Sequence, residues 1–175
     1  MILTGSEIIH QVELNRIKIS PFDISQINPN SYNFRLGDRI KYYVAHVLDP
    51  KVKQQVEEIQ IDQNGYLLKP GKIFLGHTQE IMGSDYYVPI IRGRSSTARL
   101  GLFVHVTSDI IDIGSHNQWT LQLYAVQPVK VYPGMLIGQV TFWMVQGEVE
   151  LYNGKYQGTM GPQESLIYKD FEITT

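Results

Sequence analysis

The sequence predicts a mainly β domain, either a sandwich or a barrel, preceded by one short helix. The 11 tyrosines and 15 glycines and the many valines and isoleucines among 175 residues are typical of strands and turns. Strand-like runs recur at short intervals and are separated by Gly and Pro turns. The length corresponds to little more than one domain of about 150 residues, so we expect a single domain over residues 1–175.

The helix is predicted at the start of the chain. Thr4 and Glu7 form a T-x-x-E capping box, apolar residues follow at roughly helical spacing, and Asn15 is the expected stop. After two turn-rich stretches, residues 34–43 form the first alternating run. Residues 44–63 are polar and predict an exposed excursion or hairpin, to which the sequence assigns no function.

The remaining strands are predicted beyond the Asn64-Gly65 turn, at residues 66–68, 73–81, 86–91, 102–106, 119–126, 129–132 and 135–145. Alternation from residue 119 to 124 puts one set of side chains on one face (Trp119, Leu121 and Leu123) and the other set on the opposite face (Thr120, Gln122 and Tyr124). The last 25 or so residues are polar with interleaved aromatics, which predicts a loop or lid.

Composition excludes several classes of protein. Fifteen basic and 17 acidic residues give a net charge of −2, so we expect no nucleic-acid partner. The absence of cysteine excludes disulfides, thiolate nucleophiles and zinc sites with Cys ligands. No stretch approaches 18 apolar residues and the start does not resemble a signal peptide, so we expect a cytoplasmic protein without a membrane partner.

Arginines, hydroxyls and glycines are densest in residues 92–102 (RGRSSTARLGL). Arginine forks bind phosphate oxygens bidentately, and small residues let backbone N–H groups approach the same anion. The run therefore predicts a phosphate cradle that includes Arg94, Ser95, Ser96 and Arg99, or else a solvated turn with scattered charges.

Three further residues are candidates for chemistry. Asp112 lies between two isoleucines before a glycine turn, which favours either a carboxylate tuned by apolar surroundings or a simple Asx turn. His105 alternates with two valines and is interpreted as a core or interface histidine. Gln122 could exchange hydrogen bonds with a polar ligand, but it has no titratable proton and cannot be a general base.

The stretch from residue 92 to 122, together with residues 68–71, 132–139 and 155–158, closely resembles the dCTP deaminase branch of the trimeric dUTPase superfamily. Nearly the whole chain is covered. The resemblance implies a distorted β-barrel of the dUTPase-like type that assembles as a homotrimer, with three sites formed between subunits. It also implies dCTP or dUTP as the ligand, and a C-terminal segment, residues 147–175, that closes over bound nucleotide.

The resemblance also implies roles for individual residues. Ser95 and Arg99 match the reaction centre, and Asp112 matches a carboxylate that meets the deoxyribose 3′-hydroxyl and, in the dUTPase branch, orders an attacking water. Substrate-binding roles fall on Arg94, Ser96, Ser108, Gln139, Tyr152, Lys155, Tyr156 and Thr159. Mg²⁺ is expected to bridge the nucleotide phosphates rather than to occupy a protein metal site, and no zinc is expected.

The chain departs from the family pattern at the residue expected to be catalytic. Members of the family deaminate cytosine without zinc, using a glutamate in T-L-E-L, and this chain has Gln122 in T-L-Q-L. Loss of a general base typically removes about 10²- to 10⁴-fold of rate. Thr159 and Leu166 are milder departures in the closing segment. Gln122 fits either the native residue of a paralogue or a deliberate substitution that traps substrate.

Three functions are therefore predicted. The first is a dCTP deaminase-type enzyme, converting dCTP and water to dUTP and ammonia, which is either active through a substitute base or inactive because of Gln122. The second is dUTPase-type release of pyrophosphate from dUTP, which needs Asp112 but not a glutamate at position 122. The third is a trimeric nucleotide-binding module without chemistry.

Overall fold

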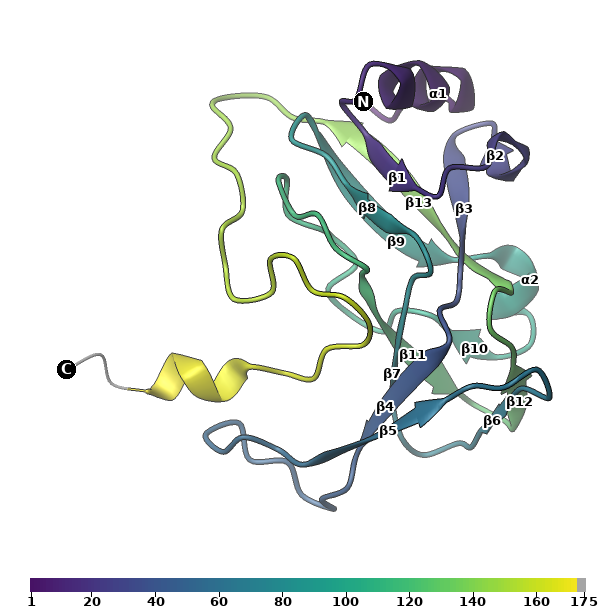
Figure 1. Cartoon of the computed structure of the whole chain (residues 1–175), viewed down its shortest axis with the longest axis vertical. Helices are drawn as coiled ribbons and strands as arrows, with labels where there is room; N and C mark the ends of the chain where they lie inside the picture. Colours follow the sequence, from purple (N-terminus) through teal and green to yellow (C-terminus); the bar gives the residue numbers. More distant parts are fainter. Residues whose placement is uncertain (173–175) are drawn as a thin grey trace.

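The computed structural model describes residues 1–172, and it begins with helix α1 (Gly5–Glu13) where the sequence predicts it (Figure 1). Thr4 Oγ1 accepts the Glu7 N–H at 3.4 Å, as the capping box requires. The Glu7 carboxylate instead accepts a hydrogen bond from Gln11 Nε2 at 2.6 Å, so the reciprocal half of the box is missing. Asn15, with a φ of 56°, ends the helix in the left-handed region.

The rest of the described chain is built mainly from strands. They are β1 (Lys18–Ser20), β2 (Ile27–Asn28), β3 (Ser31–Arg35), β4 (Arg39–Tyr43), β5 (Val56–Gln60), β6 (Tyr66–Leu68), β7 (Phe74–His77), β8 (Ile81–Gly83), β9 (Tyr87–Gly93), β10 (Leu102–Phe103), β11 (Thr120–Ala125), β12 (Val129–Val131) and β13 (Leu136–Met144). The short helices are η1 (Ile24–Gln26), α2 (Ser95–Ala98) and η2 (Ile167–Phe171). The predicted mainly β fold with a short N-terminal helix is confirmed.

Two antiparallel sheets dominate the architecture. One has the strand order β10-β11-β7-β4-β5 and the other β2-β3-β13-β9, and two-stranded pairs β1-β8 and β12-β6 flank them. Within residues 1–172 these strands form four separate sheets, so strand hydrogen bonding does not run round a closed ring. The large buried side chains of the core include Tyr32, Phe34, Phe74 and Phe142, which come from both main sheets.

The predicted run at residues 34–43 is divided between the two main sheets. β3 ends at Arg35, β4 begins at Arg39, and the chain changes sheet between them. Gly37 permits this crossing, because a Cβ at this position would lie 2.0 Å from the buried His77 ring. A local pattern of alternating residues does not show where one strand leaves its sheet, so sequence reasoning merged the two strands.

The polar stretch at residues 44–63 contains β5, which pairs with β4, so it forms a hairpin with a long loop, one of the two predicted alternatives. The other differences from the sequence prediction are small. The run at residues 102–106 contributes only Leu102 and Phe103 to β10. Part of the expected phosphate-cradle loop is the one-turn helix α2.

Candidate functional site

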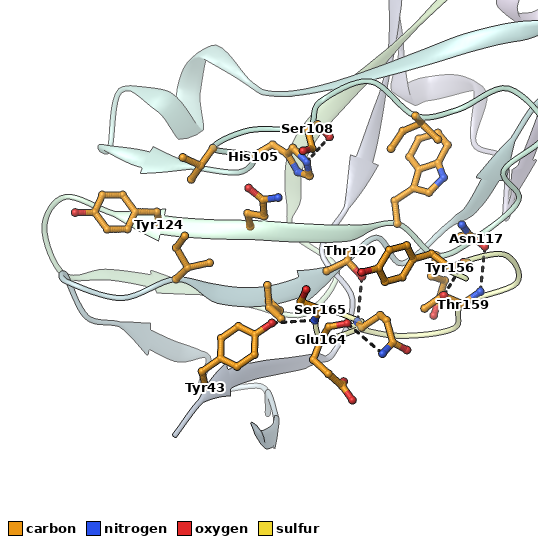
Figure 2. Close-up of a pocket in the computed structure, with 18 of the residues that line it drawn as sticks. Tyr43, His105, Ser108, Asn117, Thr120, Tyr124, Tyr156, Thr159, Glu164 and Ser165 are labelled. Atoms are coloured by element: carbon orange, nitrogen blue, oxygen red, sulfur yellow. Dashed lines mark hydrogen bonds between the residues drawn. The ribbon is translucent and has the colours of Figure 1, made fainter. Parts of the chain in front are cut away.

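A cavity of about 1050 Å³ lies beside strands β7 and β11 (Figure 2). Its walls come from the β4–β5 loop, residues 105–112, the start of β11 and the C-terminal segment around residues 152–165. Six of the residues predicted to form the site line it: Ser108, Asp112, Gln122, Tyr152, Tyr156 and Thr159.

Strand β11 places its polar face toward the cavity, as its alternation predicts. Thr120, Gln122 and Tyr124 line the cavity, whereas Leu121 and Leu123 are fully buried in the core. Trp119 borders the cavity but is buried in the same core as Leu121 and Leu123. The predicted alternation therefore holds from residue 119 to residue 124.

Gln122 is half-buried and is held by the loop that follows β10. Its Oε1 accepts the Thr107 N–H at 3.2 Å, and its backbone lies opposite Leu75 of β7. The next residue of the loop, Ser108, has a φ of 61°, an uncommon conformation for a residue other than glycine. The loop thus combines a constrained backbone with a fixed contact to position 122.

His105 anchors the same loop in the cavity wall. Its Nε2 donates a hydrogen bond to the Ser108 carbonyl oxygen at 2.8 Å. Burial lowers the pKa of His105, although the contact with Ser108 and the charge of Asp109 oppose this effect. The ring is therefore neutral near pH 7. The predicted core or interface histidine is a half-buried residue lining the candidate site.

Asp112 is exposed and lines the cavity. The turn that follows it is closed by main-chain atoms, since the Ser115 N–H donates to the Asp112 carbonyl at 3.1 Å. In the part of the chain that the structure describes, the Asp112 carboxylate makes no hydrogen bond, so the Asx-turn alternative is not supported. The carboxylate is free to contact a ligand.

The C-terminal segment is bound along the start of β11 by a series of hydrogen bonds. Thr159 N–H donates to Asn117 Oδ1 at 3.0 Å, and Gln163 N–H donates to Thr120 Oγ1 at 3.0 Å. Ser165 N–H donates to the Tyr43 hydroxyl at 2.8 Å (Figure 2). These contacts hold residues 159–165 against the cavity. The predicted segment extends to residue 175, and its last three residues lie outside the described part.

Sequence reasoning missed several residues that line the cavity, among them Tyr43, His46, Leu48 and Glu164. The first three belong to β4 and the excursion that the sequence left without a function. Lys41 Nζ lies 2.8 Å from the Glu164 carboxylate. Burial would raise the pKa of Glu164, but the hydrogen bond from Lys41 holds it below its usual value.

The other predicted site residues lie outside this cavity. Arg94, Ser95, Ser96 and Arg99 belong to α2 and its two ends, and Figure 1 shows α2 on the opposite side of the view from the C-terminal segment. Gln139 lies in β13 and accepts a hydrogen bond from Ser31 Oγ at 3.4 Å. Lys155 is paired with Asp170. A single chain therefore brings together only half of the predicted set.

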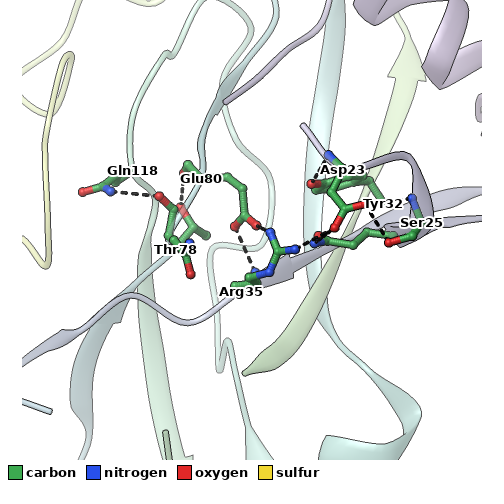
Figure 3. A network of polar contacts seen from close by, with 9 residues as sticks. Asp23, Ser25, Tyr32, Arg35, Thr78, Glu80 and Gln118 are labelled. Carbon is green, nitrogen blue, oxygen red and sulfur yellow. Dashed lines mark hydrogen bonds and ion pairs between the residues drawn. The ribbon is translucent and has the colours of Figure 1, made fainter. Parts of the chain in front are cut away.

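A buried polar network supports the start of β11 (Figure 3). Arg35 lies 2.8 Å from Asp23 and 3.1 Å from Glu80, whose side chain is fully buried. Thr78 Oγ1 donates to the Glu80 carbonyl at 2.7 Å and accepts the Trp119 N–H at 3.0 Å. Burial raises the pKa of Glu80 despite the contacts with Arg35. The network connects the ion pair in the core to the strand that carries Gln122.

The described residues contain neither a cluster of metal-ligating side chains nor a membrane-spanning helix. Among residues 1–172, no three His, Cys, Asp or Glu side chains are grouped as metal ligands would be. No helix within that range is long and apolar enough to cross a bilayer.

The chain is similar to known proteins along nearly its whole length. Residues 2–145 match the family model described as dCTP deaminase-like. A "dCTP deaminase, dUMP-forming" of Clostridium beijerinckii is 49% identical over 173 residues, covering 98% of this chain and 99% of that protein. A protein of the same description from Cytophaga hutchinsonii is 46% identical over 173 residues, with the same coverage of both chains.

A solved structure supports the fold. The crystal structure of 2′-deoxycytidine 5′-triphosphate deaminase from Agrobacterium tumefaciens matches with a TM-score of 0.66 and 22% identity. The match covers 82% of this chain and 48% of that one. The family model and the identity to full-length relatives together show that this chain belongs to the dCTP deaminase-like family.

Proposed function

We propose that this chain binds a pyrimidine deoxynucleoside triphosphate in the cavity and releases dUMP. The observation that carries the proposal is the position of the free Asp112 carboxylate and of Gln122 on the walls of one cavity of about 1050 Å³. This volume lies just above the range of about 300–1,000 Å³ that is typical of small-molecule sites. The relatives are described as dUMP-forming, so dUMP replaces dUTP as the expected final product.

The two reactions leading from dCTP to dUMP require different groups. For pyrophosphate release, Asp112 would take a proton from the water that attacks the α-phosphorus, while the bond from that phosphorus to the bridging oxygen breaks. For deamination, a group must take a proton from the water that attacks C4 and deliver it to the leaving ammonia. The Gln122 amide cannot carry this proton. We therefore expect pyrophosphate release to proceed and deamination to be slow.

We also propose that the site is completed in a homotrimer. A triphosphate needs several cationic partners, yet the residues that line the cavity include one lysine, Lys72, and no arginine. Ser95 and Arg99 are exposed at α2, outside their own chain's cavity. A neighbouring subunit that placed α2 at the cavity would supply the missing guanidinium groups.

Mg²⁺ would enter this site with the nucleotide. Two carboxylates line the cavity, those of Asp112 and Glu164, but Glu164 is paired with Lys41 at 2.8 Å, and Asp112 alone does not form a protein cage for a divalent cation. Bridging the phosphates, the ion would offset their charge.

Product analysis tests the proposal. The protein is incubated with Mg²⁺ and either dUTP or dCTP, and the products are separated by ion-exchange chromatography beside the variant Asp112→Asn. We expect dUMP from dUTP, little conversion of dCTP, and loss of dUMP formation in the variant. Binding of nucleotide without any product would contradict the proposed reaction and favour the nucleotide-binding module.

A further inference from the structure

We infer that Gln122 makes the cavity select a pyrimidine with a carbonyl at position 4, as in uracil, over one with an amino group there, as in cytosine. The inference rests on the proposed function, which places this edge of the base at position 122. It narrows the substrate from pyrimidine deoxynucleotides in general to deoxyuridine triphosphate.

The orientation of the Gln122 amide is determined by the backbone of Thr107. The Thr107 N–H is a donor and lies 3.2 Å from the amide, so the atom that faces it is the oxygen Oε1. The amide is planar, and its Nε2 therefore points in a different direction, with two hydrogens to donate.

Nε2 is not satisfied by the protein. No hydrogen bond from this atom occurs within residues 1–172, and it is not among the enclosed side-chain atoms of that range that have no partner. Gln122 is half-buried and lines the cavity. The two donors of Nε2 therefore remain accessible to a ligand.

The carboxylates near this face of the sheet are paired with Lys41, and one of them, Glu58, lies opposite Lys41 in β5 with an oxygen 3.6 Å from its Nζ. Gln122 and Lys41 lie opposite the same residue of β7, Leu75, from the two neighbouring strands, so the three side chains share one face. Glu164 lies above this face, but its carboxylate is paired with Lys41 at 2.8 Å. Lys41 is two strand spacings, about 9–10 Å, from Gln122. The amide nitrogen is thus left to the ligand.

The two bases differ in what they present to these donors. O4 of uracil is an acceptor and pairs with Nε2, whereas the amino group of cytosine is a donor and would face it with neither group satisfied. An unpaired buried polar group weakens binding, and we expect about 10- to 100-fold tighter binding of the uracil nucleotide. A glutamate at this position has acceptors only, so it would favour the cytosine amino group.

Calorimetric titration tests this inference. Non-hydrolysable α,β-imido analogues of dUTP and dCTP are titrated with Mg²⁺ into the full-length protein and into Gln122→Glu. The expected result is preference for the dUTP analogue in the parent protein, and loss or reversal of this preference in the variant. Gln163→Glu is the matched control, because Gln163 lines the same cavity and its substitution adds the same charge. This control variant should bind both analogues more weakly, by the same factor.

The outcomes separate this inference from the proposed function. Equal binding of both analogues, or tighter binding of the dCTP analogue to the parent protein, would overturn the selection by Gln122 while leaving dUMP formation intact. Either result would mean that Gln122 Oε1 accepts a hydrogen bond from the cytosine amino group through its second lone pair. Failure of the parent protein to bind either analogue would overturn the proposed function and the inference with it.

Discussion

At the scale of single residues, two positions have consequences that their neighbours do not share. The resemblance to the family implies a proton-transferring glutamate at position 122, and Gln122 has the size and shape of that residue. Glu80 is a fully buried carboxylate whose charge is balanced by Arg35. We therefore expect substitution of Gln122 to change the rate of reaction, and loss of the partner of Glu80 to lower the free energy of unfolding.

Gln122→Glu should raise the release of ammonia from dCTP by about 10²- to 10⁴-fold, because a carboxylate can accept and return the proton that an amide cannot. A coupled ammonia assay measures the rate. Hydrolysis of dUTP by the same variant, measured at a saturating concentration of dUTP so that weaker binding does not enter, is the control, since it does not need this proton transfer. An unchanged rate of ammonia release would show that position 122 does not hold the missing base.

Arg35→Met should lower the free energy of unfolding by about 3–5 kcal/mol, because it leaves the charge of Glu80 buried without a partner. Urea denaturation measures the loss. Asp23→Asn is the control: this partner of Arg35 is 39% exposed, so its removal should lower the free energy of unfolding much less. Similar losses in both variants would mean that burial of Glu80 is not the cause.

At the scale of elements, the close approach of β13 to β3 depends on a glycine. A Cβ at Gly138 would lie 2.2 Å from Phe34 Cζ and 2.9 Å from the Arg92 carbonyl oxygen. The Phe34 ring is fully buried, and the Arg92 carbonyl oxygen is part of the backbone of β9, so neither group can move away easily. The sheet β2-β3-β13-β9 therefore requires a residue without a side chain at this point.

Gly138→Ala should destabilise the protein by about 1–3 kcal/mol through overpacking. Gly93→Ala is a matched control, since Gly93 lies opposite Gly138 in β9 and its added Cβ would lie 3.6 Å from Val104, an ordinary contact. Thermal unfolding of both variants gives the comparison. Equal stability of the two variants would contradict the close approach of Phe34.

At the scale of the whole molecule, stability should fall in weak acid. Burial lowers the pKa of His77 and of His105 from the usual value of 6.5, so both rings are neutral in the folded protein. Below about pH 6.5 the unfolded chain takes up protons at these positions before the folded chain does, and the free energy of unfolding decreases.

The thermal midpoint should therefore decrease as the pH is lowered from 7 toward the lowered pKa values of the two rings. His105→Gln keeps a donor for the Ser108 carbonyl and removes one titrating group, so it should reduce the slope. The raised pKa of Glu80 acts in the opposite direction, because this carboxyl holds its proton longer in the folded state as the pH rises. A slope unchanged in the variant would exclude His105 as a contributor.

A site shared between subunits predicts complementation. Asp112→Asn and Arg99→Ala should each be inactive, since one alters the cavity and the other alters α2. Mixed trimers reassembled from equal amounts of both should recover about one quarter of the sites, those that combine an intact cavity with an intact neighbouring α2. Recovered dUMP formation from dUTP measures this. Mixtures without activity would contradict a shared site.

Local signals in the sequence were enough to predict the helix, its cap at Thr4 and its end at Asn15. They also predicted the alternation that puts Gln122 on the open face of β11. These features depend on residues within one or two turns or on a period of two, which a single sequence displays. The place of Asp112 in the family pattern was evident from the order of motifs. Its position in the cavity was confirmed, and its role stays a prediction.

Only the tertiary structure decided how distant segments meet. The cavity combines Tyr43 from β4 with the loop at Ser108 and the segment at Thr159, contacts that no local pattern encodes. The tertiary structure also showed that Asp112 lines the cavity while Arg99 of the same chain lies outside it. The orientation of the Gln122 amide depends on a hydrogen bond from Thr107, fifteen residues away in sequence. Burial and non-local hydrogen bonding arise only when the chain is folded, so these properties could not be predicted from sequence.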